Sequence, residues 1–186
     1  KDLDIEIYDI APASFDALMK KWGAKGVGKS FFVYLYEGVD LALPRSESKV
    51  ARGHQGFEVS YCNDEKVASS RRDFTMNAMM LNIFDGTLHD HWGGRRDIAL
   101  HTIRLINENA FSEDPLRVLR GMQFAARFGF IIERKTEAAM NKMDLNELSR
   151  TRIFWEMEKL FNAPHLDLGV LYMYKLQLFQ KLLHVK

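Results

Sequence analysis

Two side chains in the middle of the chain have the types and the spacing needed to read a nucleotide base. Asp114 and Arg117 stand three residues apart where a helix is expected to begin, so they would share one helical face. A carboxylate accepts a hydrogen bond from an exocyclic amine, and an arginine donates one to a ring nitrogen. Adenine and cytosine present that pair of groups, whereas guanine and uracil present a carbonyl and an N–H. The two side chains could therefore select ATP and CTP without a template.

Two carboxylates near the N-terminus have the spacing of a metal site. Asp2 and Asp4 alternate with Leu3 and Ile5, which predicts a strand whose aspartates point to the same face. Such a pair can hold two Mg²⁺ ions, of which one activates an attacking hydroxyl and the other stabilises the leaving group. The alternative is an exposed, charged strand edge, so this interpretation depends on the other segments.

Composition sets broad limits on the class of protein. The 186 residues are 47% hydrophobic and 27% charged, and the net charge is +1. This is ordinary for one or two small globular domains, and it is less basic than a dedicated nucleic-acid binder. No apolar run is long enough to span a membrane. The single cysteine, Cys62, excludes an internal disulfide and suits a reducing cytoplasm.

Apolar periodicity predicts strands in the first part of the chain and helices from Ser112 onward. Ser112 is the expected N-cap and Gly129 the expected C-cap of the first of these helices. The polar residues 46–56 are expected to form a loop. The strands are expected over residues 2–7, 31–36, 39–43 and 57–61, and the helices over residues 12–22, 73–82, 112–128, 135–143, 150–161 and 166–183.

The segment from Gly23 to Ser30 fits the P-loop pattern G-x-x-x-x-G-K-S. A P-loop follows a strand and opens a helix, but this segment follows an expected helix and enters an expected strand. We therefore reject a P-loop ATPase as the main interpretation. Lys29 could still face phosphates, although a surface lysine in a turn is an equal alternative.

Taken together, the segments resemble the class II tRNA nucleotidyltransferase and bacterial poly(A) polymerase family. The combination is specific, although no single segment is. The resemblance implies an α+β fold: a polymerase-β-like nucleotidyltransferase head with a mixed sheet over residues 1–110, followed by an all-α neck over residues 111–186. The matching segments are residues 1–7, 27–31, 43–45, 71–78, 90–94 and 113–128.

The resemblance implies a catalytic and metal-binding role for Asp2 and Asp4, with Mg²⁺ as the cofactor. Enzymes of this kind use a third carboxylate on a neighbouring strand, for which Asp40 is the candidate. A surface aspartate beside a turn is an equal alternative for Asp40. The family also has a Gly-Gly-x-x-Arg-Asp block before the Asp-x-Asp strand and has C-terminal domains that bind tRNA. Neither is present, so we expect a truncated chain that could be inactive.

The nucleotide pocket implied by the resemblance begins at the segment Arg71 to Ala78. Asp73 would accept hydrogen bonds from ribose hydroxyls, Arg72 would support the ribose or the phosphates, and Asn77 would share a helical face with Asp73. The remaining implied contacts are two base readers and one arginine that reaches the base or the triphosphate: Asp114, Arg117 and Arg120.

The loop from Asp90 to Gly94 resembles the family's Asp-x-x-Gly-Gly turn, and we interpret Asp90, Gly93 and Gly94 as structural. His89 and His91 flank this turn. The histidines show no metal-ligand spacing, so these two are expected to be solvated rather than to bind a metal.

These interpretations converge on a nucleotidyltransferase that adds CMP and AMP from CTP and ATP to the 3′ end of tRNA. Close alternatives are a poly(A) polymerase and a CC-adding or A-adding enzyme, because the same base readers suit all of them. The alternative from another class is a non-catalytic module that binds RNA or nucleotides. The expected partners are an RNA 3′ end, ATP and CTP, and no membrane.

Overall fold

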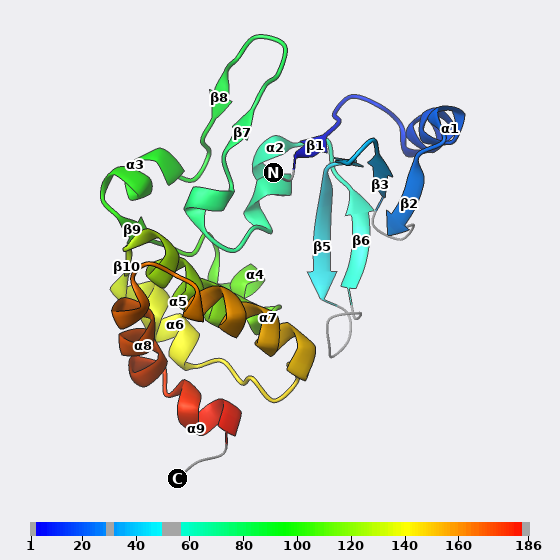
Figure 1. The fold of residues 1–186 in the computed structure, drawn as a ribbon. Helices are drawn as coiled ribbons and strands as arrows, with labels where there is room; N and C mark the ends of the chain where they lie inside the picture. Colours follow the sequence, from blue (N-terminus) through cyan, green and yellow to red (C-terminus); the bar gives the residue numbers. More distant parts are fainter. Residues whose placement is uncertain (1–2, 29–31, 50–56, 184–186) are drawn as a thin grey trace. The chain divides into compact units, whose positions relative to one another are not determined.

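The computed structural model of the chain describes residues 3–28, 32–49 and 57–183 (Figure 1). They belong to two compact units, Lys1–Ser69 and Ser70–Lys186, each with its own cluster of buried apolar side chains. The fold class is α+β, as expected. Among the described residues, no helix has the length and the apolar character needed to span a bilayer.

The first unit is built on a mixed four-stranded sheet with the order β1-β4-β3-β2. β1 and β4 are parallel, whereas β3 is antiparallel to both β2 and β4. Glu37 and Gly38 join β3 to β4 with positive φ angles of 48° and 82°, which a tight two-residue hairpin turn requires. The strands are β1 (Asp4–Glu6), β2 (Lys25–Gly28), β3 (Val33–Tyr36) and β4 (Val39–Ala42).

Helix α1 (Pro12–Trp22) packs on one face of this sheet and has the predicted bounds. Its Phe15 and Met19 are fully buried, and the Phe15 ring meets the Tyr34 ring edge-on at 5.6 Å between centroids. Gly23 ends the helix in the left-handed conformation, with φ 71°, which glycine adopts without strain. The opposite face of the sheet is therefore available for polar side chains.

A second hairpin corrects one sequence prediction. β5 (Arg45–Lys49) and β6 (Phe57–Tyr61) pair antiparallel along their whole length. The loop expected over residues 46–56 is therefore wrong over residues 46–49, because pairing with β6 along the whole strand compensates for the low strand propensity of a polar segment. The rest of that loop lies outside the described residues.

The helix predicted over residues 73–82 is also wrong. Only a 3₁₀ turn, η2 (Thr75–Asn77), forms there, and the strand β7 (Met80–Leu81) follows it. Phe74 is extended and pairs in an antiparallel bridge with Leu105. Tertiary pairing therefore outweighs the weak helical pattern of the segment. A short helix that we did not predict, α2 (Glu65–Ser70), precedes it.

The second unit continues with a β7–β8 hairpin and a series of helices (Figure 1). Ser112 is not the predicted N-cap, because it is the last residue of α4, whose N-cap is Asn107. The elements are β8 (Leu88–His89), α3 (Gly94–Ala99), β9 (Thr102–Ile103), α4 (Glu108–Ser112), α5 (Leu116–Phe128), β10 (Ile131–Ile132), α6 (Arg134–Asn141), α7 (Arg150–Phe161), α8 (Leu166–Lys175) and α9 (Leu178–Leu183).

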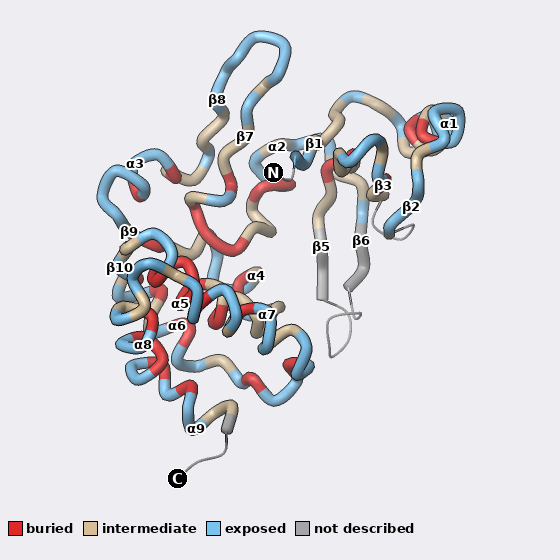
Figure 2. Tube along the Cα trace, in the orientation of Figure 1, coloured by how far each residue is buried: buried red, intermediate tan, exposed pale blue. Residues whose placement is uncertain are grey.

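Helix α5 is the centre of this unit, and its middle turns are buried in Figure 2. Val118, Leu119 and Met122 have no exposed surface and belong to a core that also includes side chains of α7 and α8. Gly129 ends α5 with φ 70°, as predicted. The single helix expected over residues 166–183 is instead two helices, separated at Gln177, whose φ is 55°.

Candidate functional site

The first unit places two of the predicted catalytic carboxylates side by side. Asp4 of β1 and Asp40 of β4 are direct partners in the parallel register, so their side chains leave the same face of the sheet, about 4.8 Å apart at the backbone. Within the described residues, neither carboxylate accepts a hydrogen bond or joins an ion pair. The register thus provides two adjacent carboxylates whose oxygens remain available.

Two residues of the sequence analysis cannot be located. Asp2 and Lys29 lie outside the described residues, and their roles stay predictions. The described part of the P-loop-like segment includes strand β2, which follows helix α1. That order of helix and strand is the opposite of a P-loop, and it agrees with our rejection of a P-loop ATPase.

The second unit brings two predicted nucleotide-binding residues, Asn77 and Arg120, to a third, Asp73, whose side chain is buried. One carboxylate oxygen accepts from the backbone N–H of Phe74 at 2.8 Å and from Asn77 Nδ2 at 2.9 Å. The other accepts from Arg120 Nε at 2.7 Å. Arg72 is half-buried directly before Asp73 in the chain. Asp73 is therefore held rigidly, although η2 and not a helix brings Asn77 to it.

Arg120 is positioned by two contacts of its guanidinium group. Besides the ion pair with Asp73, its Cζ lies 5.0 Å from the centroid of the Phe124 ring. Within the described part of the chain, the terminal nitrogens Nη1 and Nη2 make no hydrogen bond. A third of the side-chain surface is exposed. The arginine can therefore donate to an anionic ligand without giving up its ion pair.

Asp114 precedes helix α5 instead of lying in its first turn. One oxygen accepts from the backbone N–H of Leu116, the first residue of the helix, at 3.1 Å, so one of the N–H groups that the helix leaves without a partner is satisfied. The other oxygen forms an ion pair with Arg152 Nη2 of α7 at 2.8 Å. Sequence reasoning missed Arg152, because a partner 38 positions away leaves no local spacing signal.

Arg117 is held by backbone carbonyl groups. Its Nη1 donates to the Ala110 oxygen at 2.5 Å, and its Nη2 donates to the Arg71 oxygen at 2.6 Å. These two bonds account for two of the five N–H groups of the guanidinium. Arg117 therefore ties the start of α5 to the segment that carries Asp73.

The turn before α3 has the structural character that we expected. Asp90 accepts from the backbone N–H groups of Gly94 at 2.7 Å and Arg95 at 3.0 Å. Burial raises the pKa of Asp90, but hydrogen bonds from the backbone outweigh it and hold the pKa below its usual value. Gly93 has φ 78°, and a Cβ on Gly94 would lie 2.4 Å from the Thr75 carbonyl oxygen. Both glycines are therefore required by the backbone.

A buried polar network was not predicted from the sequence. Asp97 accepts from Thr75 Oγ1 at 2.7 Å and from Arg104 Nε at 3.1 Å. Arg104 Nη1 donates to Glu133 at 3.0 Å, and Glu133 caps α6 through the Thr136 N–H at 3.0 Å. Its members lie far apart in the sequence, so only the fold shows that they are connected. The network fixes the segment after Asp73 to helix α6.

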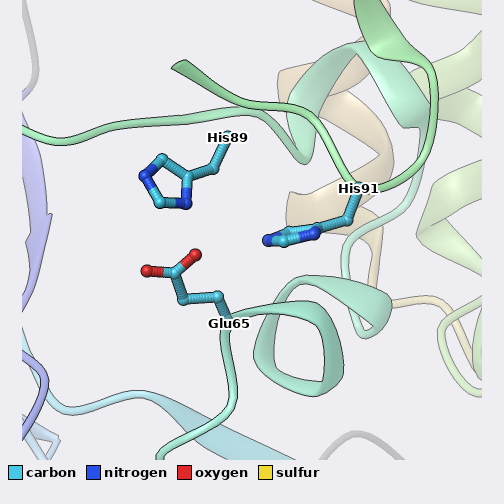
Figure 3. A group of neighbouring side chains, drawn as sticks. All are labelled: Glu65, His89 and His91. Atoms are coloured by element: carbon cyan, nitrogen blue, oxygen red, sulfur yellow. The ribbon is translucent and has the colours of Figure 1, made fainter. Parts of the chain in front are cut away.

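The two histidines beside the turn are drawn in Figure 3, together with Glu65 of α2. The rings of His89 and His91 lie 6.1 Å apart at an angle of 64°, and His91 is exposed. Their expected role as solvated side chains stays a prediction.

Two family models match the chain. The model described as "Poly A polymerase head domain" matches residues 1–104, and "Probable RNA and SrmB- binding site of polymerase A" matches residues 129–185. A protein from Aromatoleum aromaticum named Multifunctional CCA protein is 42% identical over 168 residues, which are 84% of this chain and 40% of that protein. A protein of the same name from Haemophilus ducreyi is 39% identical over 162 residues, 80% of this chain and 39% of that protein. The chain thus spans about two fifths of the length of these relatives.

Solved structures agree with these matches. The Bacillus stearothermophilus CCA-adding enzyme in complex with CTP has 27% identity and a TM-score of 0.76, over 93% of this chain and 42% of that one. The Thermotoga maritima CCA-adding enzyme complexed with tRNA has 26% identity and a TM-score of 0.73, over 97% and 43%. The head-domain model alone matches more than half of the residues of this chain. The chain therefore belongs to the poly(A) polymerase head-domain family, which is the same tRNA nucleotidyltransferase and bacterial poly(A) polymerase family that its sequence motifs resemble.

Proposed function

We propose that the protein is a template-independent nucleotidyltransferase that adds CMP and AMP, from CTP and ATP, to the 3′ end of tRNA. The observation that carries the proposal is the 42% identity to a protein named Multifunctional CCA protein. The pair Asp4 and Asp40 and the Asp73 cluster support it, because they supply the carboxylates and the cations that phosphoryl transfer needs.

We propose a head domain over residues 1–110 and a neck domain over residues 111–186. The ranges of the two family models, 1–104 and 129–185, support this division. The two compact structural units divide at Ser69 instead, so domain and structural unit are not the same here. The location in the cytoplasm stays a prediction that rests on the single cysteine.

Nucleotidyltransferases of this family use a divalent metal ion, which we propose to be Mg²⁺. Asp2 and Asp4 would hold it, with Asp40 as the third carboxylate. The parallel register of Asp4 and Asp40 fits a hard cation, because carboxylate oxygens are the ligands that Mg²⁺ prefers. A bound ion would activate the attacking RNA 3′-hydroxyl and neutralise charge on the leaving pyrophosphate.

The nucleotide would bind to the second unit through Arg72, Asp73, Asn77 and Arg120. One oxygen of Asp73 accepts hydrogen bonds from Phe74 and Asn77, and the other accepts one from Arg120. Each carboxylate oxygen offers two lone pairs, so the second oxygen can still accept from a ribose hydroxyl. The terminal nitrogens of Arg120 would donate to the triphosphate or the base.

Base selection would rest on Asp114 and Arg117. Each oxygen of Asp114 makes one hydrogen bond, to Leu116 or to Arg152, and retains a lone pair for the exocyclic amine of adenine or cytosine. Arg117 would donate to the ring nitrogen. Its hydrogen bonds to two backbone carbonyls fix the orientation of the guanidinium plane. Discrimination between bases would then depend on the direction of the hydrogen bond as well as on charge.

An incorporation assay tests the proposal. The protein is offered a tRNA that lacks its 3′ CCA, together with Mg²⁺ and each labelled nucleotide in turn. Addition of two C and one A, followed by arrest, is the expected result. Long A tails would identify a poly(A) polymerase, and C alone or A alone would identify a CC-adding or an A-adding enzyme. Nucleotide binding without any incorporation would contradict the proposal and indicate a non-catalytic module.

A further inference from the structure

Four rings on the second unit form a continuous series of contacts that we call the aromatic ladder: Phe124, Phe128, Phe130 and His101. The rings of Phe124 and Phe128 stack at 5.8 Å between centroids and 27° between planes. Phe128 lies 5.8 Å from Phe130, and Phe130 stacks on His101 at 5.1 Å and 21°. The proposed nucleotide and metal sites use none of these rings.

The ladder follows from local structure at the end of α5. Phe124 and Phe128 are four residues apart and so lie on one helical face. Gly129 then ends the helix, and the chain enters β10, which pairs in parallel with β9. The backbone N–H of Ile131 donates to the His101 oxygen at 2.8 Å, which brings Phe130 beside His101.

The ladder runs from the core to the surface. Phe124 is 8% exposed and touches the fully buried Phe74, whereas Phe128 is 43% exposed and His101 lies at the surface. The backbone of His101 has φ 49°, a conformation that costs energy for a residue other than glycine. An apolar core alone does not require an exposed stack or a strained histidine.

Two guanidinium groups accompany the rings. The Cζ of Arg120 lies 5.0 Å from the Phe124 centroid, and the Cζ of Arg127 lies 5.2 Å from the Phe128 centroid. Arg127 is exposed and joins no ion pair with another described residue. Arg120 also bonds Asp73, so the ladder is continuous with the proposed nucleotide site.

We propose that the aromatic ladder binds the unpaired 3′ end of an RNA, with bases stacking along Phe128 and His101 and a phosphate at Arg127. The inference rests on the proposed function, and it names the surface that receives the RNA. Alternating π-faces and cations are the surface that single-stranded nucleic acids recognise. Duplex RNA keeps its base faces covered, so the ladder selects unpaired nucleotides, and its contact with Arg120 directs them toward the nucleotide site.

The test compares Phe128→Leu with Phe84→Leu. Leucine keeps apolar volume but removes the ring. Phe84 is a matched control, because it is 94% exposed at the tip of the β7–β8 hairpin and touches no ladder residue. Fluorescence anisotropy measures the Kd for a short labelled single-stranded RNA that ends in CC. We expect Phe128→Leu to raise that Kd about tenfold, whereas Phe84→Leu and the Kd for CTP change less than twofold.

Two further variants separate stacking from charge and from misfolding. His101→Asn keeps a residue that tolerates positive φ while removing the ring, and it should weaken RNA binding about threefold to tenfold. The slope of log Kd against log salt concentration should fall in Arg127→Ala by the amount that about one phosphate contact contributes. Arg127→Lys should restore that slope.

Equal RNA affinity in Phe128→Leu and the unchanged protein would overturn the inference, as would an absence of RNA binding by the unchanged protein. Neither result would contradict the proposed function if CTP binding and nucleotide incorporation persist. Conversely, a protein that binds RNA through the ladder but incorporates no nucleotide would contradict the proposed function alone.

Discussion

The two units hold their candidate site residues in opposite ways. In the first unit, Asp4 and Asp40 are placed by backbone register alone, and their carboxylates have no hydrogen-bond partner among the described residues. In the second unit, Asp73, Asp114 and Arg117 are each held by two or more hydrogen bonds. Strand pairing positions the first pair, and side-chain bonding positions the second group.

This difference matches the ligands proposed for each unit. A divalent cation itself orders the carboxylates that bind it, so free oxygens are an advantage in a metal site. A base or a ribose offers only neutral hydrogen-bonding groups, so selectivity needs protein groups that are already fixed. We therefore expect mutations of the site residues in the first unit to change the rate of nucleotide transfer but not the free energy of unfolding. Mutations of the site residues in the second unit should change both.

The largest expected effect comes from Asp4→Asn. The substitution removes a charge that we propose to hold the metal, and we expect nucleotide transfer to fall by about a thousandfold or more. The free energy of unfolding should change by less than about 0.5 kcal/mol, because the carboxylate bonds no described side chain. Single-turnover kinetics and urea unfolding measure the two effects. Glu6→Gln, on the same face of β1, is the control, and full turnover in Asp4→Asn would contradict the metal assignment.

Asp73→Asn is the corresponding change in the second unit. It leaves Arg120 without its ion-pair partner and weakens the bond from Asn77. Because Arg120 is partly exposed, we expect a loss of about 2 kcal/mol in the free energy of unfolding, with weaker CTP binding. Urea unfolding and calorimetric titration with CTP are the measurements. Unfolding curves that match those of Asp4→Asn would remove the contrast between the two units.

The sequence predicted a helix or strand correctly where the residues that determine it lie within or beside that element. Helix α1 has the predicted bounds because Pro12, the Phe15–Met19 spacing and Gly23 all lie within or beside it. The helix predicted over residues 73–82 failed, because Phe74 pairs with Leu105, a contact that no local pattern encodes. Strand β5 was missed for the same reason, since it forms by pairing with β6, which begins eight residues after β5 ends.

The candidate site shows the same limit. Chemistry and family resemblance named Asp73, Asn77 and Arg120, and the structure joins them around one carboxylate. Residue spacing could not reveal that Arg152 pairs with Asp114, because that bond depends on how α7 packs against the start of α5. The expected helical face shared by Asp114 and Arg117 also assumed a helix that begins earlier than Leu116.

Arg117→Ala should have an intermediate effect that combines selectivity and stability. Loss of the guanidinium should reduce the preference for CTP and ATP over UTP and GTP by about tenfold, the usual value of one good base contact. It also leaves the Ala110 and Arg71 carbonyls without their donor, so stability should fall by about 1 kcal/mol. Ratios of kcat/KM for the four nucleotides measure the first effect. Unchanged ratios in a destabilised protein would mean that the base is read elsewhere.

The smallest expected effect is a pH dependence from Glu133 in the second unit. Burial raises the pKa of Glu133, but hydrogen bonds from Thr136 and the charge of Arg104 outweigh it and lower the pKa below its usual 4.5. The stabilisation that this shift provides is therefore complete above pH 4.5 and is lost as the pH falls through the lower, folded-state pKa. Glu133→Gln should be less stable than the unchanged protein at neutral pH, and the gap should narrow in acid, as measured by urea unfolding at several pH values. If the difference in free energy of unfolding between Glu133→Gln and the unchanged protein does not vary with pH, the charge of Glu133 does not contribute to the stability of α6.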